Sequence, residues 1–239
     1  TMDTAIIDWR TPAIKRRLIE DDPLDWPTIF GNHNPIDLEI GIGNGSFLVP
    51  FCAHNKLRNM VGIEIDGFYL KKADRKLNQT GLTNGRLLIG DAKLFTWRLF
   101  GKETIADVYI NYPDPWFKKR RLKRRVINTL MLQMLATRMT GVLTIATDDA
   151  DYRDWVFEAI RDSGCWESLI PEGFSSQLEG YIQTKYERKW KAMGKPCYYM
   201  RYRKTTNPVF STDHYITEQN LQFPLRKYAE ELQSDIVEL

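Results

Sequence analysis

Several features that define common protein classes are missing from this sequence. Its three cysteines, Cys52, Cys165 and Cys197, match neither a disulfide framework nor a metal site, and its three histidines form no metal-binding motif. We therefore expect no metal and buried, reduced thiols. No apolar run approaches the roughly 20 residues of a membrane span, and the N-terminus lacks the apolar core of a signal peptide. These absences favour a cytoplasmic protein.

A large overall charge is also missing. The formal net charge is only +3 over 239 residues, so binding of a nucleic acid must rely on local clusters of cations. Seven of the eight residues from Lys118 to Arg125 are Lys or Arg. Such a run can be a solvated loop, but its place directly after the proline-rich stretch Asn111-Tyr112-Pro113-Asp114-Pro115-Trp116 favours a surface that binds a polyanion. For the shorter run Lys15–Arg17 we expect only a solvated face.

What the sequence does contain, from Ile36 onward, is a regular alternation of short apolar runs and segments of helical periodicity. The runs predict strands at 36–40, 59–64, 86–90, 105–110, 141–147 and 197–203. Helices are expected at 46–54, 69–77, 126–138 and 152–160. This rhythm predicts an α/β fold with a doubly wound, mostly parallel sheet and right-handed crossovers.

The strand expected at 105–110 leads directly into Asn111-Tyr112-Pro113-Asp114-Pro115-Trp116. Two prolines stop a strand or helix from continuing, so the chain must leave the sheet here. Open α/β sheets bind ligands outside the carboxyl ends of their strands. The Asp114 carboxylate and the Trp116 indole are therefore expected at a ligand site. Trp116 has two possible roles, stacking on a base or packing in the core.

Gly41, Gly43 and Gly45 follow the first of these strands and precede a helix. Glycines at such a turn let the backbone approach a ligand closely. The loop alone is a weak signal, because dinucleotide enzymes use a related loop.

Three acids at the same edge of the sheet carry more information. Glu39 precedes the glycine loop, while Glu64 and Asp91 end the next two strands. Glu64 is placed to accept hydrogen bonds from ribose hydroxyls, and Asp91 could accept one from the exocyclic amine of adenine. Glu39 lies where an ammonium or sulfonium would be favoured. S-adenosylmethionine has these groups and no phosphate, whereas the three acids would repel the pyrophosphate of NAD. We therefore expect S-adenosylmethionine as the cofactor. The alternative is that these acids cap helices or pair with lysines.

The chain resembles the bacterial tRNA (guanine-N7-)-methyltransferases. The resemblance spans about residues 24–204 and rests on ordered segments, which are Leu38–Gly45, Gly62–Glu64, Gly90–Ala92, Tyr112–Lys118, Lys123–Arg125, Ala146–Asp148 and Thr184–Glu187. It implies a Rossmann-like class I methyltransferase fold, with a seven-stranded sheet that includes an antiparallel late strand. The stretch after Thr205 has no counterpart in the family.

By resemblance, Asp114 is the catalytic residue and also touches the cofactor, and the substrate is a guanosine in the variable loop of tRNA. The predicted cofactor contacts, which include the three glycines of the loop, are Glu39, Gly41, Gly43, Gly45, Glu64, Asp91, Ala92 and Asp114. The predicted tRNA contacts, which include five residues of the basic run, are Lys118, Arg120, Lys123, Arg124, Arg125, Asp148, Thr184, Lys185, Tyr186 and Glu187.

The chemistry of guanine N7 narrows the role of Asp114. N7 carries a lone pair and no proton, so methyl transfer to it needs alignment rather than a general base. The ring becomes cationic as the bond forms, and a carboxylate can stabilise that charge. We expect Asp114 to orient guanine through its N1–H or amino group and to stabilise the cation.

Three other functions remain open from the sequence. Asn111-Tyr112-Pro113 faintly resembles a motif of methyltransferases that act on amino groups of nucleic acids. The protein could also be a nicotinamide-dependent oxidoreductase, or an RNA-binding module without catalytic activity.

We divide the chain into an N-terminal segment (1–35), a methyltransferase domain (36–204) and a C-terminal extension (205–239). In the extension, Leu225, Tyr228, Leu232 and Ile236 predict one amphipathic helix. This helix is expected to pack on its own domain or on a sister subunit, so the protein is a monomer or a homodimer.

Overall fold

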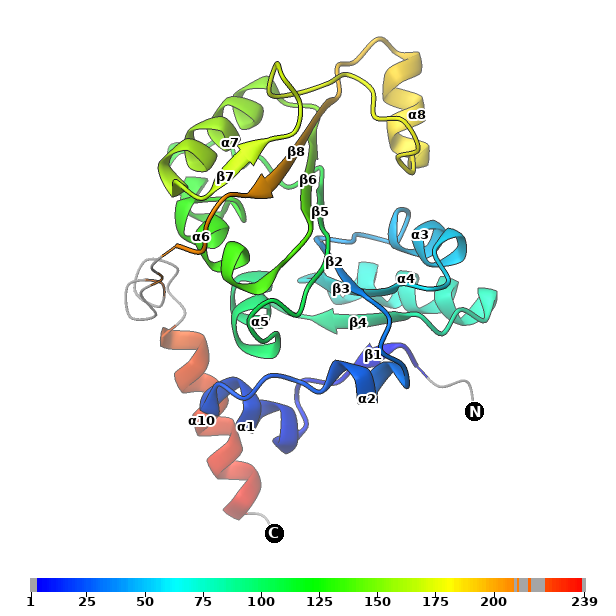
Figure 1. Ribbon diagram of the computed structural model, residues 1–239. Helices are drawn as coiled ribbons and strands as arrows, with labels where there is room; N and C mark the ends of the chain where they lie inside the picture. The colour runs from blue at the N-terminus through cyan, green and yellow to red at the C-terminus, as the bar shows by residue number, and fades with distance from the viewer. Residues whose placement is uncertain (1–3, 209, 211–214, 216–221, 238–239) are drawn as a thin grey trace.

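The computed structural model describes residues 4–208, 210, 215 and 222–237. Its centre is one sheet (Figure 1) with the strand order β1-β4-β3-β2-β5-β6-β8-β7. The strands are β1 (Ile6–Ile7), β2 (Ile36–Ile40), β3 (Asn59–Glu64), β4 (Gly85–Ile89), β5 (Val108–Asn111), β6 (Val142–Thr147), β7 (Trp166–Ser168) and β8 (Tyr198–Lys204). The helices are α1 (Pro12–Glu20), α2 (Trp26–Phe30), α3 (Leu48–His54), α4 (Gly67–Thr80), α5 (Ala92–Leu99), the 3₁₀ helix η1 (Lys119–Arg124), α6 (Thr129–Arg138), α7 (Ala150–Ser163), α8 (Lys185–Ala192) and α10 (Gln222–Val237).

The predicted doubly wound α/β fold is confirmed. Strands β1 to β6 pair in parallel, and β8 pairs antiparallel with both β6 and β7. Every residue of β2 and β3 is buried, as in a strand covered on both faces. The described sheet has eight strands rather than the expected seven. A strand as short as β1, with two residues, leaves almost no periodic signal in the sequence.

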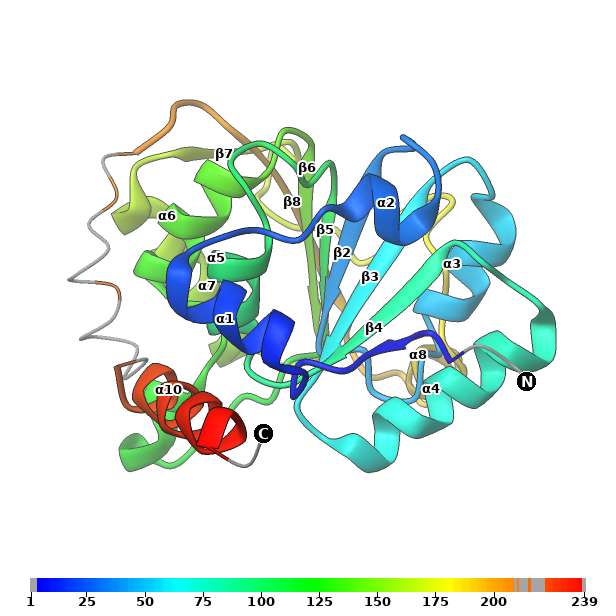
Figure 2. The same cartoon turned by 90° about the horizontal axis from the view of Figure 1, so that it is seen from below.

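Helices cover both faces of the sheet (Figure 2). Helices α1, α2, α5, α6 and α7 share the larger hydrophobic core on one face, and α3 and α4 form the smaller core on the other. Gly62 in β3 shows how closely α3 approaches, because a Cβ there would lie 2.5 Å from Leu48 Cδ1. The three cysteines are buried free thiols, as expected. Within the described ranges, no helix has the length and hydropathy that crossing a membrane requires.

Some element boundaries differ from the prediction. Strand β5 begins at Val108 rather than at residue 105, where Ile105 forms only an isolated bridge with Met139 and the Asp107 carboxylate accepts from the Val142 amide at the start of β6. The helix expected from residue 126 begins at Thr129, where the Asn128 side chain accepts from the Met131 amide. The helix expected at 46–54, which is α3, begins at Leu48 instead of residue 46. Each start depends on a local hydrogen bond or turn that apolar periodicity does not report.

The C-terminal helix α10 packs against α1 (Figure 1). Lys15 of α1 is buried and pairs with Glu231 and Asp235 of α10, at 3.4 and 3.1 Å. Trp9 and Tyr228 add an edge-on ring contact at 4.8 Å. The solvated role predicted for Lys15 is therefore wrong, because a partner 220 residues away in the sequence covers it. Of the two options for the predicted amphipathic helix, the structure shows packing on its own chain, although the Ile236 side chain lies outside the described residues.

Candidate active site

The glycine loop connects the end of β2 to α3. Gly43 and Gly45 have φ values of 53° and 77°, which are in the left-handed region that favours glycine. The Gly43 amide donates to Glu64 Oε2 at 2.8 Å. Because Glu64 ends β3, this bond holds the loop against the carboxyl end of the neighbouring strand.

Glu39 is the most unusual ionisable group of the site. Its side chain is 2% exposed, and Oε1 accepts from Asn111 Nδ2 at 3.3 Å. Among the described residues, Oε2 has no hydrogen-bond partner although it is buried. Burial, together with the charge of Glu64, raises the pKa of Glu39 to about 8. A cationic group bound beside such a buried acid would favour its ionised form and give the free oxygen a partner.

Glu64 and Asp91 lie at the same edge and already make local hydrogen bonds. The second oxygen of Glu64 accepts from the Asp66 amide at 3.0 Å. Asp91 Oδ1 accepts from the Lys93 amide at 2.8 Å and caps α5. The helix-capping alternative therefore applies to Asp91. Each carboxylate oxygen has more than one lone pair, so these bonds leave acceptor capacity for a ligand.

The loop after β5 is held in a strained conformation. Tyr112 and Trp116 have φ values of 49° and 46°, which side chains other than glycine rarely adopt. Between them Asp114 is exposed. Trp116 lies outside the core and faces cations, with the guanidinium carbons of Arg121 and Arg124 at 5.7 and 5.3 Å from its ring. Strain of this kind is typical of functional loops.

Arg125 is the one residue of the basic run that the structure places inside. It is 6% exposed, and its Nε donates to the Pro115 backbone oxygen at 2.6 Å. Its guanidinium carbon lies 5.1 Å from the Tyr152 ring and 4.6 Å from the Trp155 ring. This burial argues against the RNA contact predicted for Arg125. The sequence could not distinguish it from the exposed Lys118, Arg120, Lys123 and Arg124.

The predicted substrate residues 184–187 form the start of α8. Thr184 caps this helix by accepting from the Glu187 amide at 3.2 Å, while Lys185 and Tyr186 are exposed. Glu187 is 0% exposed, and its Oε2 accepts from Tyr199 Oη at 3.2 Å. Burial also raises the pKa of Glu187.

A chain of polar and aromatic side chains joins the cofactor edge to α8. Tyr181 donates to Asn111 Oδ1, and Asn111 donates to Glu39. The Tyr181 ring is 5.4 Å from that of Tyr199, which is the partner of Glu187. Sequence reasoning missed Asn111 and Tyr181 as site residues. Only Asn111 carried a signal, because it opens the proline-rich motif.

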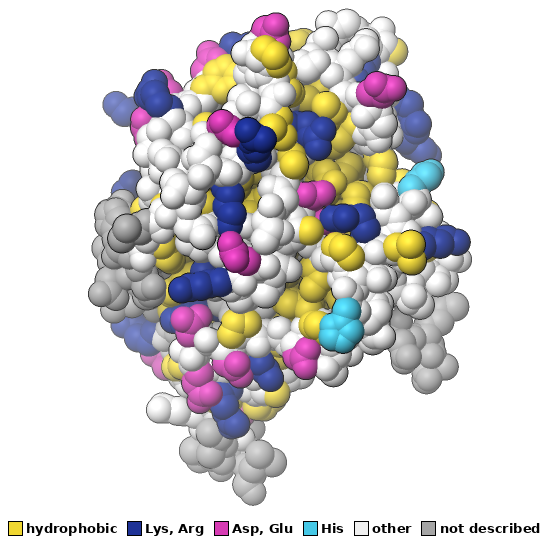
Figure 3. Space-filling model, viewed as in Figure 1, with side chains coloured by type: hydrophobic (Ala, Val, Ile, Leu, Met, Phe, Trp, Pro, Cys, Tyr) yellow, Lys and Arg dark blue, Asp and Glu magenta, His cyan; other side chains and the backbone are white. Residues whose placement is uncertain are grey.

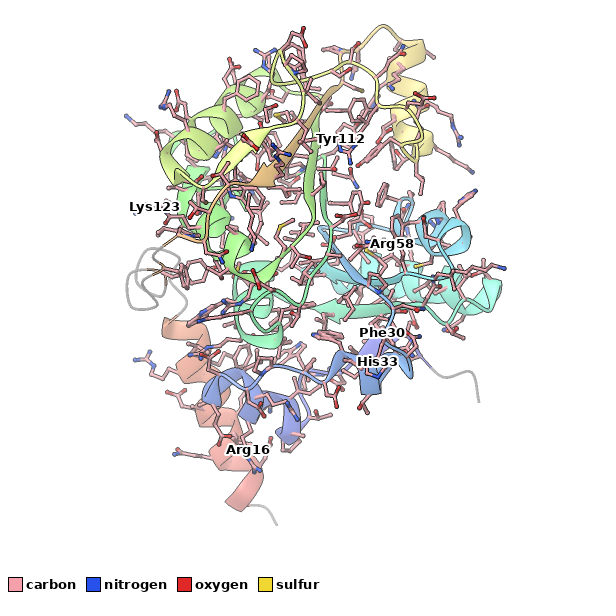
Figure 4. All side chains as sticks on the ribbon, in the orientation of Figure 1. Arg16, Phe30, His33, Arg58, Tyr112 and Lys123 are labelled. Carbon is pink, nitrogen blue, oxygen red and sulfur yellow. The ribbon has the colours of Figure 1, made fainter. Side chains whose placement is uncertain are left out.

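Most of the sequence-predicted residues lie at or beside the carboxyl edge of the sheet. Ala92 begins α5, and Asp148 follows β6, next to the Asp149 cap of α7. Figure 4 shows Tyr112 between the sheet and α8, and Lys123 beside α6, on the other side of the sheet. The structure therefore divides the predicted tRNA contacts between η1 on one face and α8 on the other.

Comparisons with known proteins agree with this arrangement. A family described as "Putative methyltransferase" matches residues 33–200. The tRNA (guanine-N(7)-)-methyltransferase of Syntrophotalea carbinolica is 33% identical over 213 residues, which span 88% of this chain and 92% of that protein. The protein of the same name from Geobacter metallireducens is 36% identical over 189 residues, covering 77% of this chain and 88% of that protein. This chain belongs to the tRNA (guanine-N7-)-methyltransferase family.

Solved structures share the fold of this family member at much lower identity. The 16S rRNA methyltransferase KamB has a TM-score of 0.54 at 15% identity, covering 77% of this chain and 95% of its own. A SAM dependent methyltransferase from Aquifex aeolicus has a TM-score of 0.50 at 12% identity, and the match covers 82% of this chain and 99% of that one. At such identities the likeness concerns the fold alone.

The side chains at this methyltransferase site fit S-adenosylmethionine. The buried, unpartnered oxygen of Glu39 suits an ammonium or sulfonium, and acids at the ends of β3 and β4 suit hydroxyl and amine donors. A pyrophosphate would instead meet Glu39, Glu64 and Asp91 at one edge, which disfavours a dinucleotide.

Proposed function

We propose that this protein transfers a methyl group from S-adenosylmethionine to N7 of a guanosine in the variable loop of tRNA. The observation that carries the proposal is the buried Glu39 carboxylate. Its Oε2 has no hydrogen-bond partner among the described residues, and its Oε1 is joined through Asn111 to the strained loop that bears Asp114. Membership of the tRNA (guanine-N7-)-methyltransferase family supports the same reaction.

On the cofactor side, Glu39 would hold the cationic amino-acid end and Glu64 the ribose hydroxyls. Asp91 and Ala92 would line the adenine end, and the glycine loop would allow close approach of the backbone. When bound, the cofactor supplies an electrophilic methyl group on a sulfonium.

On the substrate side, Asp114 would accept from the N1–H or amino group of guanine and so align N7 with the methyl group. It would also stabilise the positive charge that develops on the ring. No general base is required, because N7 carries no proton. Arg125 would set the position of Asp114 by holding the Pro115 carbonyl.

A guanosine that is stacked in folded tRNA has to be exposed before it can enter the site. We propose that Lys118, Arg120, Lys123 and Arg124 hold phosphates during this step. Asp148 and the residues Thr184 to Tyr186 would contact the base and its sugar, whereas the buried Glu187 would act by holding the start of α8 in place. We further propose that the reaction takes place in the cytoplasm and that the enzyme is a monomer or a homodimer.

A methylation assay tests the function directly. The protein is incubated with labelled S-adenosylmethionine and tRNA from a strain that lacks this modification. We expect label in tRNA, and we expect borohydride and aniline to cleave the chain at one variable-loop guanosine. Label that resists this cleavage would indicate an amino-group methyltransferase, and absence of label would overturn the proposal.

A further inference from the structure

A groove lies between α3, α4 and the segment that leads into α8, on the opposite face of the sheet from η1. Its volume is about 1230 Å³. Figure 1 shows α8 above α3, and Figure 3 shows hydrophobic side chains below α8 with Lys and Arg side chains around them. Asn44, Gly45 and Phe47, at and after the glycine loop, line one end, and Gln79 and Thr80 of α4 line another part. The groove therefore adjoins the cofactor edge.

Positive charge prevails in this groove. Among the described residues that line it there is no Asp or Glu, and its cations are Lys76, Lys185, Arg188 and Lys189. The Lys76 ammonium donates to the Asn44 backbone oxygen at 2.9 Å, which fixes a cation beside the glycine loop. Burial, followed by the charges of Lys185 and Lys72, lowers the pKa of Lys76. Anions would be favoured here because they relieve this repulsion.

The remaining groups of the groove suit unpaired nucleotides. Tyr186 is 60% exposed and lines the groove, and Asn55 and Gln79 supply amide donors and acceptors. Cations along a groove with an accessible aromatic ring are typical of sites for single-stranded nucleic acid. An acidic peptide would also meet the cations, but the groove shares Thr184 to Tyr186 with the residues proposed to hold tRNA. This continuity favours RNA.

We propose that the groove binds a stretch of single-stranded RNA next to the target guanosine, with its phosphates at Lys76, Arg188 and Lys189. The inference rests on the proposed function and adds the wall formed by α3 and α4, which the sequence did not connect with RNA. Because η1 lies on the other face of the sheet, the tRNA is held from both sides of the catalytic edge.

The test uses the full chain with two substitutions in the groove, Gln79→Glu and Lys189→Gln. Both side chains are exposed, and Gln79→Glu keeps the shape of the side chain. The control carries Gln233→Glu in α10 and Lys102→Gln, which are exposed, lie outside the groove and change the net charge equally. Binding of unmodified tRNA is measured from about 50 to 200 mM salt, beside binding of S-adenosylhomocysteine.

We expect the groove variant to bind tRNA at least about tenfold more weakly than the control at low salt. The slope of log affinity against log salt should fall by about 0.7 for each phosphate that the variant no longer neutralises. Binding of S-adenosylhomocysteine should not change. Equal tRNA affinity and slope in the two variants would overturn the inference, as would an acidic peptide that occupies the groove without competing with tRNA. Failure of the unsubstituted protein to methylate tRNA would instead overturn the proposed function.

Discussion

Asp114 is exposed between two residues with positive φ, so it can act on a substrate without first being uncovered. Replacing it with Asn keeps the shape but removes the charge that would stabilise a cationic guanine. We expect Asp114→Asn to lower kcat by about 100-fold, the usual loss for one electrostatic group. The loss should be similar from about pH 6 to 9, because no proton is abstracted. A kcat equal to that of the unsubstituted enzyme at every pH would remove Asp114 from the mechanism.

Glu39 predicts a pH dependence of cofactor binding. With a pKa of about 8, it is mostly protonated near neutral pH. An ammonium bound beside it favours the carboxylate, so binding must release a proton below about pH 8 and affinity must rise towards that pH. Calorimetry of S-adenosylhomocysteine binding near pH 7, in buffers of different ionisation enthalpy, should show release of about one proton.

Glu39→Gln should bind the same ligand more weakly and release no proton. The matched control is Glu158→Gln, at an exposed position of α7, which should behave like the unsubstituted protein. Proton release that persists in Glu39→Gln would assign the titrating group elsewhere.

Arg125 should act through the catalytic loop rather than through RNA. Lys keeps the charge but lacks the planar guanidinium that bonds Pro115 and lies against two aromatic rings. We expect Arg125→Lys to lower kcat about tenfold at saturating tRNA, with little change in KM, and to reduce the free energy of unfolding by about 1–3 kcal/mol. Arg124→Lys, at an exposed position, is the comparison. Weakened tRNA affinity with an intact kcat in Arg125→Lys would contradict this assignment.

At the scale of elements, η1 concentrates exposed cations on one short helix. Reversing Arg120, Lys123 and Arg124 to Glu should weaken tRNA binding by at least about 100-fold at ~0.1 M salt, because phosphates that are no longer neutralised keep their counterions. The control reverses Lys102, Arg161 and Arg203, three exposed cations outside η1 and the groove. Filter binding at low and high salt compares the two. Identical binding would mean that η1 is only a solvated helix.

The strands and most helices could be predicted because buried parallel strands and amphipathic helices have characteristic spacings. Leu38, Val61 and Ile110 show these patterns in the sequence. The 3₁₀ form of η1 and the short strand β1 could not be predicted from the sequence, since neither has an apolar repeat. The inward turn of Arg125 depends on Tyr152 and Trp155, which follow 27 and 30 residues later.

At the scale of the whole molecule, Tyr215 packs into the main core, far in the sequence from the residues that surround it. Tyr215 is fully buried, its hydroxyl donates to the Lys93 backbone oxygen at 2.7 Å, and its ring lies 5.4 Å from that of Trp97. We expect Tyr215→Phe to lower the free energy of unfolding by about 1 kcal/mol and Tyr215→Ala by about 3–5 kcal/mol. Urea unfolding measures both.

Leu57→Ala is the control, because this side chain is 80% exposed and its loss should change stability by no more than about 0.5 kcal/mol. A similarly small effect of Tyr215→Ala would support residues 205–239 as an independent appendage. The domain division drawn from the sequence stays a prediction until this is measured.

The sequence by itself determined the α/β class, the glycine loop, the three edge acids and the proline-bracketed Asp114, because each depends on local spacing or on the end of a single strand. Only the tertiary structure decided which charged groups are buried. Glu39 and Glu187 lose solvent, Arg125 turns inward, and Lys15 meets α10, through contacts between residues distant in the chain. Burial is a property of packed elements, whereas sequence patterns report mainly the preferences of one element at a time.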